Sequence, residues 1–221
     1  MTKAVVSFLV AFLMLVQTPA LFAQSGDRAV DDTRGAMEFI EQLANDTIAV
    51  WSDQLMNKTE REEAFRQIFL KASDVRLLAQ AMLGRHYRTA SKEQRQAYMT
   101  VMTEYIVTEF GNRMTQIGFK DVKVTGTTPA PGRRGHLWVK TEVDRDEGSP
   151  LLADWRVRKT NGTFQVVNLE VEGINLVITT REYFASRIKE LGGLDQLIAE
   201  LERDYITNKA DTEAMATETS G

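Results

Sequence analysis

Residues 151–171, LLADWRVRKTNGTFQVVNLEV, have the pattern of a β-hairpin. The middle dipeptide, Asn161-Gly162, is the strongest short hairpin signal, because a type I′ turn requires positive φ at both central residues. On either side of it, apolar residues recur with a period of two, which is typical of half-buried strands. The predicted register pairs Thr160 with Thr163, Val157 with Val166 and Trp155 with Asn168.

That register gives each face of the hairpin large apolar residues. One face carries Trp155, Val157, Phe164, Val166 and Asn168. The other face carries Leu152, Asp154, Arg156, Val167, Leu169 and Val171. Since neither face is cleanly polar, we expect both to be covered at least in part by other elements.

Further strands and helices are predicted from the hydrophobic period along the rest of the chain. The period of two begins at Val122, so the four strands are 122–127, 137–143, 151–158 and 164–171. Spacings of three and four predict helices over 37–51, from 59, from 73, over 92–110, over 182–191 and over 194–205. The predicted fold class is α+β, a mostly antiparallel four-stranded sheet packed with about six helices.

Capping patterns locate several helix ends. Thr59 with Glu62 has the spacing of a capping box, as has Ser91 with Gln94. Gly84 stands where a helix ending at Leu83 needs a left-handed residue. The basic stretch LGRHYRTASKEQRQAY, residues 83–98, is therefore first of all a corner between two helices.

The two ends of the chain differ in composition from the middle. Lys3 and an apolar run of 13 residues, Ala4 to Val16, precede small residues. This is the pattern of a secretory signal peptide over residues 1–23. Its apolar run is too short for a membrane-spanning helix, which needs about 20 residues. Cleavage is predicted after Ala23, with Ala20 as the alternative. The remainder is predicted to form one domain, 24–206, followed by a disordered tail, 207–221, which has almost nothing to bury.

Several kinds of chemistry are excluded by composition. The chain has no cysteine, a formal net charge of −4 and two histidines, His86 and His136, without a second ligand at metal spacing. No serine lies in a G-x-S-x-G elbow, and no glycine-rich phosphate loop is present. We therefore predict no catalytic residue, no metal, no cofactor and no nucleic-acid partner.

Two longer stretches carry a family resemblance. LGRHYRTASKEQRQAYMTVMTEYIVTEF (83–110) and VEGINLVITTREYFASRIKELGGLDQLIAEL (171–201) resemble the MlaC, or toluene-tolerance auxiliary, family of periplasmic phospholipid-binding proteins. The resemblance is densest at Leu83-Gly84-Arg85, Glu172-Gly173 and Gly193-Leu194-Asp195. It implies a periplasmic carrier that holds the tails of a diacyl glycerophospholipid in an apolar cavity. It also implies two partners, an outer-membrane lipoprotein complex and the inner-membrane MCE-domain protein of an ABC transporter.

The chain departs from the family pattern at a few positions. They are His86-Tyr87, Val167-Asn168, Asn175 and Thr179-Thr180. These departures bear on the identity of the lipid, and a hopanoid-carrying branch of the family stays open as an alternative. Two further alternatives are an exported interaction module whose apolar rows simply pack together, and an exported enzyme with Asn168 or His136 in its pocket.

The implied tail cavity is expected between the helices and the sheet, with apolar residues from both. The predicted lipid-binding residues are Phe69, Leu78, Met82, Tyr98, Val101, Met102, Tyr105, Leu137, Val139, Trp155, Val157, Val166, Ile174 and Leu176.

Overall fold

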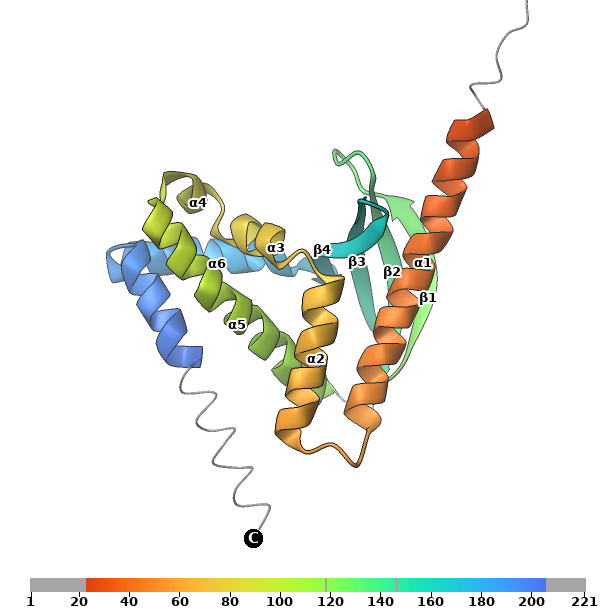
Figure 1. The fold of residues 1–221 in the computed structure, drawn as a ribbon, viewed down its shortest axis with the longest axis horizontal. Helices are drawn as coiled ribbons and strands as arrows, with labels where there is room; N and C mark the ends of the chain where they lie inside the picture. The colour runs from red at the N-terminus through yellow and green to blue at the C-terminus, as the bar shows by residue number, and fades with distance from the viewer. Residues whose placement is uncertain (1–22, 118, 146, 206–221) are drawn as a thin grey trace, which may run out of the picture.

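The computed structural model describes residues 23–117, 119–145 and 147–205. The predicted signal peptide, apart from Ala23, and the predicted tail lie outside the described residues. Within these ranges the chain forms one antiparallel sheet of five strands in the order β1-β2-β3-β4-β5 (Figure 1). The strands are β1 (Phe119–Pro129), β2 (His136–Arg145), β3 (Leu151–Thr160), β4 (Thr163–Val171) and β5 (Ile174–Asn175).

Six labelled helices and an unlabelled helix over 194–205 accompany the sheet. They are α1 (Ala23–Ser52), α2 (Lys58–Ala72), α3 (Val75–Leu83), α4 (Arg85–Thr89), α5 (Lys92–Ile117) and α6 (Leu176–Leu191). The α+β fold class is confirmed. The sheet has one more strand than predicted, because β5 is only two residues long and too short for a periodicity to show.

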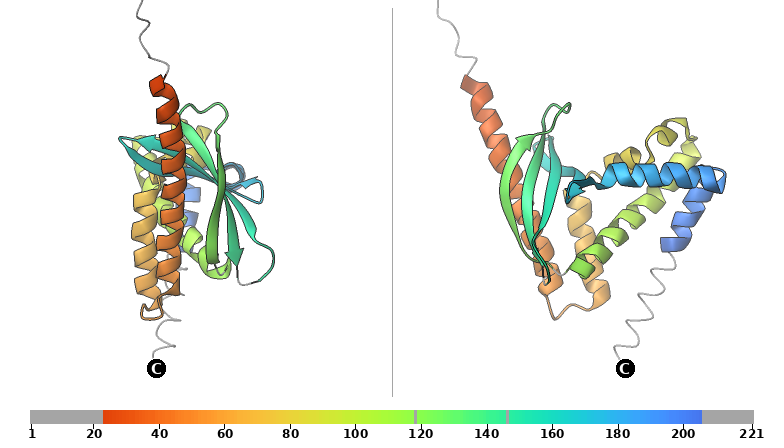
Figure 2. Two further views of the ribbon diagram at one scale, coloured as in Figure 1. Left: turned by 90° about the vertical axis from the view of Figure 1, so that its right-hand side faces the viewer. Right: turned by 180° about the vertical axis from the view of Figure 1, so that it is seen from behind.

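The helices fall into two groups around the sheet. Figure 2 shows the sheet and α1 on one side of the molecule, α3, α5 and α6 on the other, and α2 between them. α1 packs against β1, β2 and β3, whereas α6 and α3 contact β4. The largest core cluster joins α2, α3, α5, α6 and the helix over 194–205.

The hairpin register is confirmed at the turn and wrong beyond it. Asn161 and Gly162 have φ values of 51° and 83°, and Thr160 lies opposite Thr163. Val157 lies opposite Val166, but a β-bulge then shifts the pairing, so that Trp155 lies opposite Leu169 in place of Asn168. The bulge inserts one extra residue in β4 and turns every later side chain of that strand to the other face. Leu169 and Val171 therefore share a face with Trp155, and Asn168 does not.

Several helix ends differ from the prediction. The capping box of α2 is formed by Asn57 and Glu60, two residues before the predicted Thr59 box, because Asn is an equally good N-cap at the same spacing. The box of Ser91 and Gln94 is confirmed, with each backbone N–H donating to the other side chain at 3.0 and 3.1 Å. α6 begins at Leu176, where the Asn175 side chain accepts from the N–H of Ile178.

The helix corner at Gly84 is held by more than a turn. Gly84 has φ 60° and ψ −124°, a region open to glycine but outside the left-handed helical conformation that we expected. A Cβ at this position would lie 2.9 Å from Cδ of Arg181. The Arg181 Nε donates to the carbonyl of Ala81 at 2.7 Å, which ties α6 to α3. The corner thus joins two helices that are distant in sequence.

Within the described ranges, no helix has both the length and the apolarity needed to cross a membrane.

Candidate functional site

A cavity of about 310 Å³ lies between the sheet and the helices α1 and α2. Protein interiors contain few voids larger than a water molecule, so a space of this size is not a packing defect. It is at the lower end of the roughly 300–1,000 Å³ that small-molecule sites occupy. The cavity is therefore large enough to hold a ligand.

Two helices form one wall of the cavity. α1 contributes residues three and four apart on one face, and α2 contributes its C-terminal half. These residues are Ile40, Leu43, Ala44, Thr47 and Ile48 from α1, with Phe65, Phe69 and the adjoining Ser73 from α2. The Thr47 hydroxyl donates to the carbonyl of Leu43 at 2.7 Å, so its polarity is used within the helix.

The sheet and the start of α6 form the opposite wall. They supply Phe119, Val122, Val143, Leu151, Ala153, Trp155, Val166, Leu169, Val171 and Leu176. The β-bulge is what brings Leu169 and Val171 to this wall, since without it both would face away from Trp155. The bulge thus makes this side of β4 apolar.

The indole N–H of Trp155 has a hydrogen-bond partner within the sheet. Its indole Nε1 donates to the Thr141 hydroxyl at 3.1 Å, and that hydroxyl donates to the carbonyl of Ala153 at 2.8 Å. Thr141 itself is only 1% exposed. A buried N–H without a partner costs about 1–3 kcal/mol, and this chain of two bonds removes that cost.

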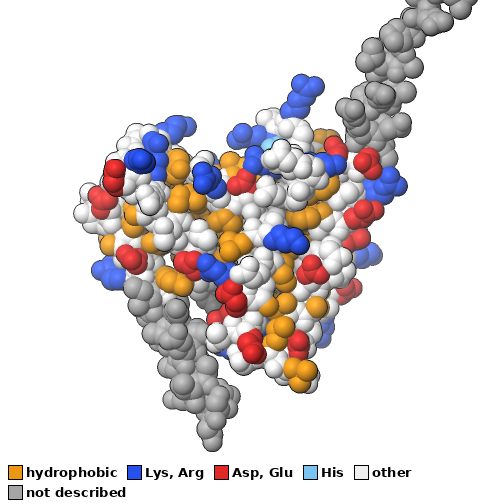
Figure 3. Space-filling view, viewed as in Figure 1, with side chains coloured by type: hydrophobic (Ala, Val, Ile, Leu, Met, Phe, Trp, Pro, Cys, Tyr) orange, Lys and Arg blue, Asp and Glu red, His pale blue; other side chains and the backbone are white. Residues whose placement is uncertain are grey.

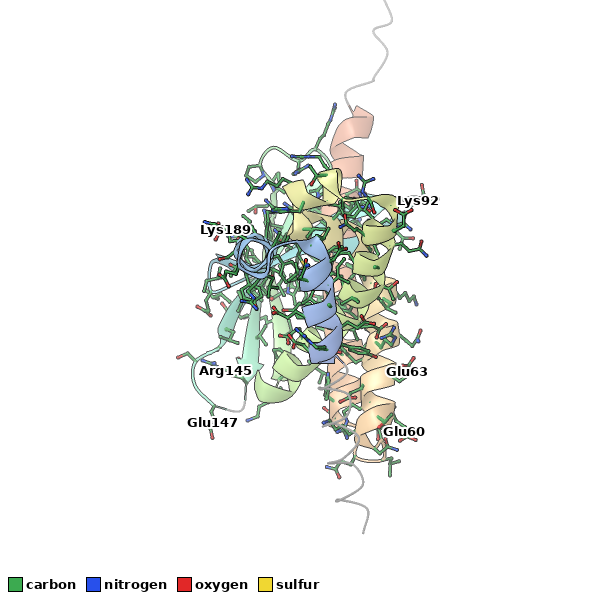
Figure 4. The ribbon with its side chains drawn as sticks, turned by 90° about the vertical axis from the view of Figure 1, so that its left-hand side faces the viewer. Glu60, Glu63, Lys92, Arg145, Glu147 and Lys189 are labelled. Carbon is green, nitrogen blue, oxygen red and sulfur yellow. The ribbon has the colours of Figure 1, made fainter. Side chains whose placement is uncertain are left out.

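The residues of the cavity wall differ in burial. Four lining residues are half-buried at the end of the sheet where β1 and β3 begin and β4 ends. They are Phe119, Leu151, Val171 and Leu176. Ile40, Phe69, Ser73 and Val166 on the remaining wall are buried. Leu43, Ala44 and Ile48 of α1 are half-buried as well. The accessible parts of the wall are therefore the α1 side and the end of the sheet that carries the β2–β3 loop, where Figure 4 labels Arg145 and Glu147.

Two exposed apolar side chains lie at this end of the sheet. Leu152 is 54% exposed and Ile174 is 57% exposed, and both are large hydrophobic residues. Figure 3 shows further hydrophobic side chains along the seam between α1 and α2, down to the connecting loop, where Leu55 is 94% exposed. Ile174 lies opposite Val171 of the cavity wall and is thus apolar surface beside the cavity. Leu152 faces away from the cavity, because Leu151 and Ala153 on either side of it line the wall.

The structure brings together four of the predicted lipid-binding residues. Phe69, Trp155, Val166 and Leu176 all line the cavity. Ile174 lies on β5, at the exposed surface beside Leu176. These five residues come from α2, β3, β4, β5 and the start of α6.

The other predicted residues lie in two packed cores and not on the cavity wall. Those of the helical core are Leu78, Met82, Tyr98, Val101, Met102 and Tyr105. The wide apolar stripe of α5 is covered by α3, α6 and the helix over 194–205, because these helices and not the sheet pack against it. Leu137, Val139 and Val157 pack with Ala36 and Ile40 of α1 beyond the cavity.

Tyr98 shows how closed the helical core is. Its side chain is fully buried, and its hydroxyl donates to the carbonyl of Ala79 at 2.9 Å. Burial raises the pKa of this hydroxyl above its ordinary value, so it stays protonated as a hydrogen-bond donor.

Sequence reasoning missed the contribution of α1. The spacing of Ile40, Ala44 and Ile48 does predict an amphipathic helix, but the pattern does not say which surface that helix covers. Leu169 and Val171 were missed because the bulge has no signature in the sequence.

None of the side chains that line the cavity is an acid or a base, so the hydroxyl groups of Thr47 and Ser73 have no base among the lining residues to activate them as nucleophiles. His136 and Asn168, the polar residues considered for an enzyme, do not line it. The Asn168 side chain accepts from the N–H of Leu169 at 2.9 Å. Nor do three or more metal-binding side chains gather anywhere in the part of the chain that the structure describes.

The fold and the site together define an α+β protein with an apolar, ligand-sized cavity between its sheet and two helices. The chain belongs to the MlaC protein family, whose pattern matches residues 41–203. This is a family of non-enzymatic carriers, in agreement with the prediction that the chain is not an enzyme.

A solved structure has the same fold. It is a phospholipid-binding protein from Ralstonia solanacearum in complex with a phospholipid. The two structures agree with a TM-score of 0.67 at 20% sequence identity, over 79% of this chain and 98% of the other. The α+β architecture is therefore shared over nearly the whole of that protein.

Proposed function

We propose that this chain is a periplasmic lipid carrier that holds the acyl tails of a phospholipid in the cavity between α1, α2 and the sheet. The observation that carries the proposal is the wall itself: it is apolar except for Thr47 and Ser73. Two tails of sixteen carbons would cost on the order of 20 kcal/mol in water, at about 0.8 kcal/mol for each methylene group. A carrier must cover that surface, and no catalytic group is needed to do so.

The cavity volume indicates how much of the lipid fits without movement. At about 310 Å³, the cavity is about twice the roughly 150 Å³ that accommodates one benzene molecule in an engineered apolar cavity. It thus holds part of one tail, and two full tails require the wall to move outward. We expect α1 to move, because it ends in a loop at Asp53 and joins α2 there.

Hydrogen exchange tests that movement. The amides of residues 40–48 should exchange at different rates in lipid-loaded and delipidated protein, whereas those of α5 should not differ. Equal exchange of α1 in the two states would refute the movement and leave only a single tail segment as the ligand.

The test of the carrier function is the ligand itself. The full chain is expressed into a bacterial periplasm, and the purified protein is weighed by native mass spectrometry and extracted with organic solvent. We expect diacyl glycerophospholipid with little headgroup selectivity, since the cavity wall binds tails. Hopanoid without phospholipid would change the substrate class, and protein that never carries lipid would favour the interaction module.

Membership of the MlaC family supports a proposal about two protein partners. We propose that the chain receives and delivers phospholipid at an outer-membrane lipoprotein complex and at the MCE-domain protein of an inner-membrane ABC transporter. Transfer of fluorescent phospholipid between the loaded chain and vesicles that contain either complex tests this. Transfer at the same rate to vesicles without protein would contradict a role for the complexes.

A further inference from the structure

A block of basic and aromatic side chains lies on the sheet face turned away from the cavity. In the register of β2 and β3, His136 lies opposite Arg158 and Trp138 lies opposite Arg156. Residues two apart on a strand share a face, and so do directly opposed residues. These four side chains therefore project from one face, while Trp155 projects from the other into the cavity wall.

The β1–β2 loop adds another positive charge to this block. Arg133 lies close enough to act on both His136 and Arg156. Burial, and after it the charges of Arg156, Arg158 and Arg133, lowers the pKa of His136. Burial and the charge of Arg133 likewise lower the pKa of Arg156. Figure 3 shows Lys and Arg side chains gathered at the end of the molecule where this loop lies.

The charges of the block are mostly uncompensated. Arg158 forms an ion pair with Asp74. In the described ranges, by contrast, neither Arg133 nor Arg156 has a carboxylate at ion-pair distance. The carboxylate that raises the pKa of Arg156 is that of Glu170. This carboxylate already accepts a hydrogen bond from the Asn175 side-chain amide at 2.7 Å. Positive charge is thus left over at the block.

Hydrogen-bonding capacity is also left over. Nε of Arg156, Nε of Arg158 and Nδ1 of His136 are all buried without a hydrogen-bond partner among the described residues. Such atoms are rare in folded proteins and costly, and here three of them fall in one block. The Arg156 guanidinium lies over the ring of Trp138, 5.7 Å from its centroid, which holds it in place.

We propose that Arg133, His136 and Arg156, beside Trp138, form a binding site for a phosphate group. A tetrahedral phosphate oxyanion has several acceptor oxygens and a charge that two guanidinium groups can match. The site lies on the opposite face of the sheet from the cavity, so it does not take the headgroup of a lipid held there. Its phosphate comes either from solution or from the headgroups of a membrane surface.

The experiment titrates the full mature chain with two probes. The first probe is inorganic phosphate, with chloride at equal ionic strength as the control. Its binding is followed by NMR of the Trp138 indole N–H, which is one of three indole signals in the chain. The signal is assigned by its loss in the variant Trp138→Phe. The second is sedimentation with vesicles of phosphatidylglycerol and phosphatidylcholine in equal parts. If inorganic phosphate shifts the Trp138 indole signal and chloride does not, the site binds free phosphate. If the chain binds vesicles but inorganic phosphate does not shift this signal, the site binds lipid headgroups.

Two variants and a control decide whether the block is responsible. Arg156→Gln and Arg133→Gln should each weaken binding at least about tenfold, because each removes a charge-assisted donor. Arg133→Gln alters only an exposed loop side chain and keeps the test valid if Arg156→Gln fails to fold. The control is Arg88→Gln, an exposed arginine on α4. Equal loss in Arg88→Gln, or no binding of either probe by the wild type, would overturn the proposal.

Discussion

Replacing Ala44 by Trp should weaken tail binding strongly and leave the fold intact. Ala44 is half-buried on α1 and lines the cavity. An indole added at this position enters space that is empty in the ligand-free protein, and it displaces ligand from there. If it displaces about four methylene groups, binding weakens by about 3 kcal/mol, or roughly two hundredfold.

The matched control is Asn45→Trp, the same indole on the next residue of the same helix, which is exposed. Both variants and the wild type are delipidated, and the dissociation constant of a fluorescent diacyl phospholipid is measured for each. Melting is followed by circular dichroism on delipidated protein only, because bound ligand stabilises the native state by mass action. Ala44→Trp should melt within about 4 °C of the wild type, since filling a void avoids the cost of overpacking. Binding by Ala44→Trp within twofold of the wild type would refute the assignment of this cavity as the tail site.

Val101→Trp should behave in the opposite way, because it overpacks the helical core at a cost of about 1–3 kcal/mol. This variant should melt several degrees lower and still bind lipid. Loss of lipid at an unchanged melting temperature would contradict this prediction. Gly84→Ala should lower the free energy of unfolding by more than about 1 kcal/mol, because its Cβ would lie 2.9 Å from Cδ of Arg181; Gly126→Ala, with nothing within 4 Å, is the control in the same urea titration. Because burial and nearby arginines lower the pKa of His136, its neutral form is favoured in the folded state. Stability is therefore full above about pH 6.5 and falls as the pH drops through the lowered folded pKa, and urea titrations of His136→Gln should show a smaller fall than the wild type.

The hairpin could be predicted from sequence because its information is local. Asn161-Gly162 specifies the turn, and the turn fixes the pairing as far as Val157 and Val166. The bulge that follows could not be predicted, since Val167 is an ordinary strand residue and only the packing of β4 shows that it is the inserted one. One unpredicted residue was enough to put Leu169 on the wrong face.

The cavity wall was harder to predict than the fold for a related reason. The apolar stripe of α5 and that of α1 have similar spacing in the sequence, so nothing local says which one faces the sheet. The structure shows that α5 is covered by other helices and α1 by the sheet. The basic block on the other face was likewise hidden, because the register of β2 and β3 brings Arg156 beside Trp138, and only the β1–β2 loop brings Arg133 near them.

The placement of Thr141 explains how a tryptophan can serve on an apolar wall. Trp155 gives a large flat surface to the cavity, but its N–H needs a partner when it is buried. Thr141, on the neighbouring strand, accepts that hydrogen bond and donates its own hydroxyl hydrogen bond to the Ala153 carbonyl. No donor is then left for a ligand or a water molecule on that part of the wall. If the wall holds the tails of the proposed ligand through contact area alone, lipids that differ in headgroup are expected to bind with similar affinity.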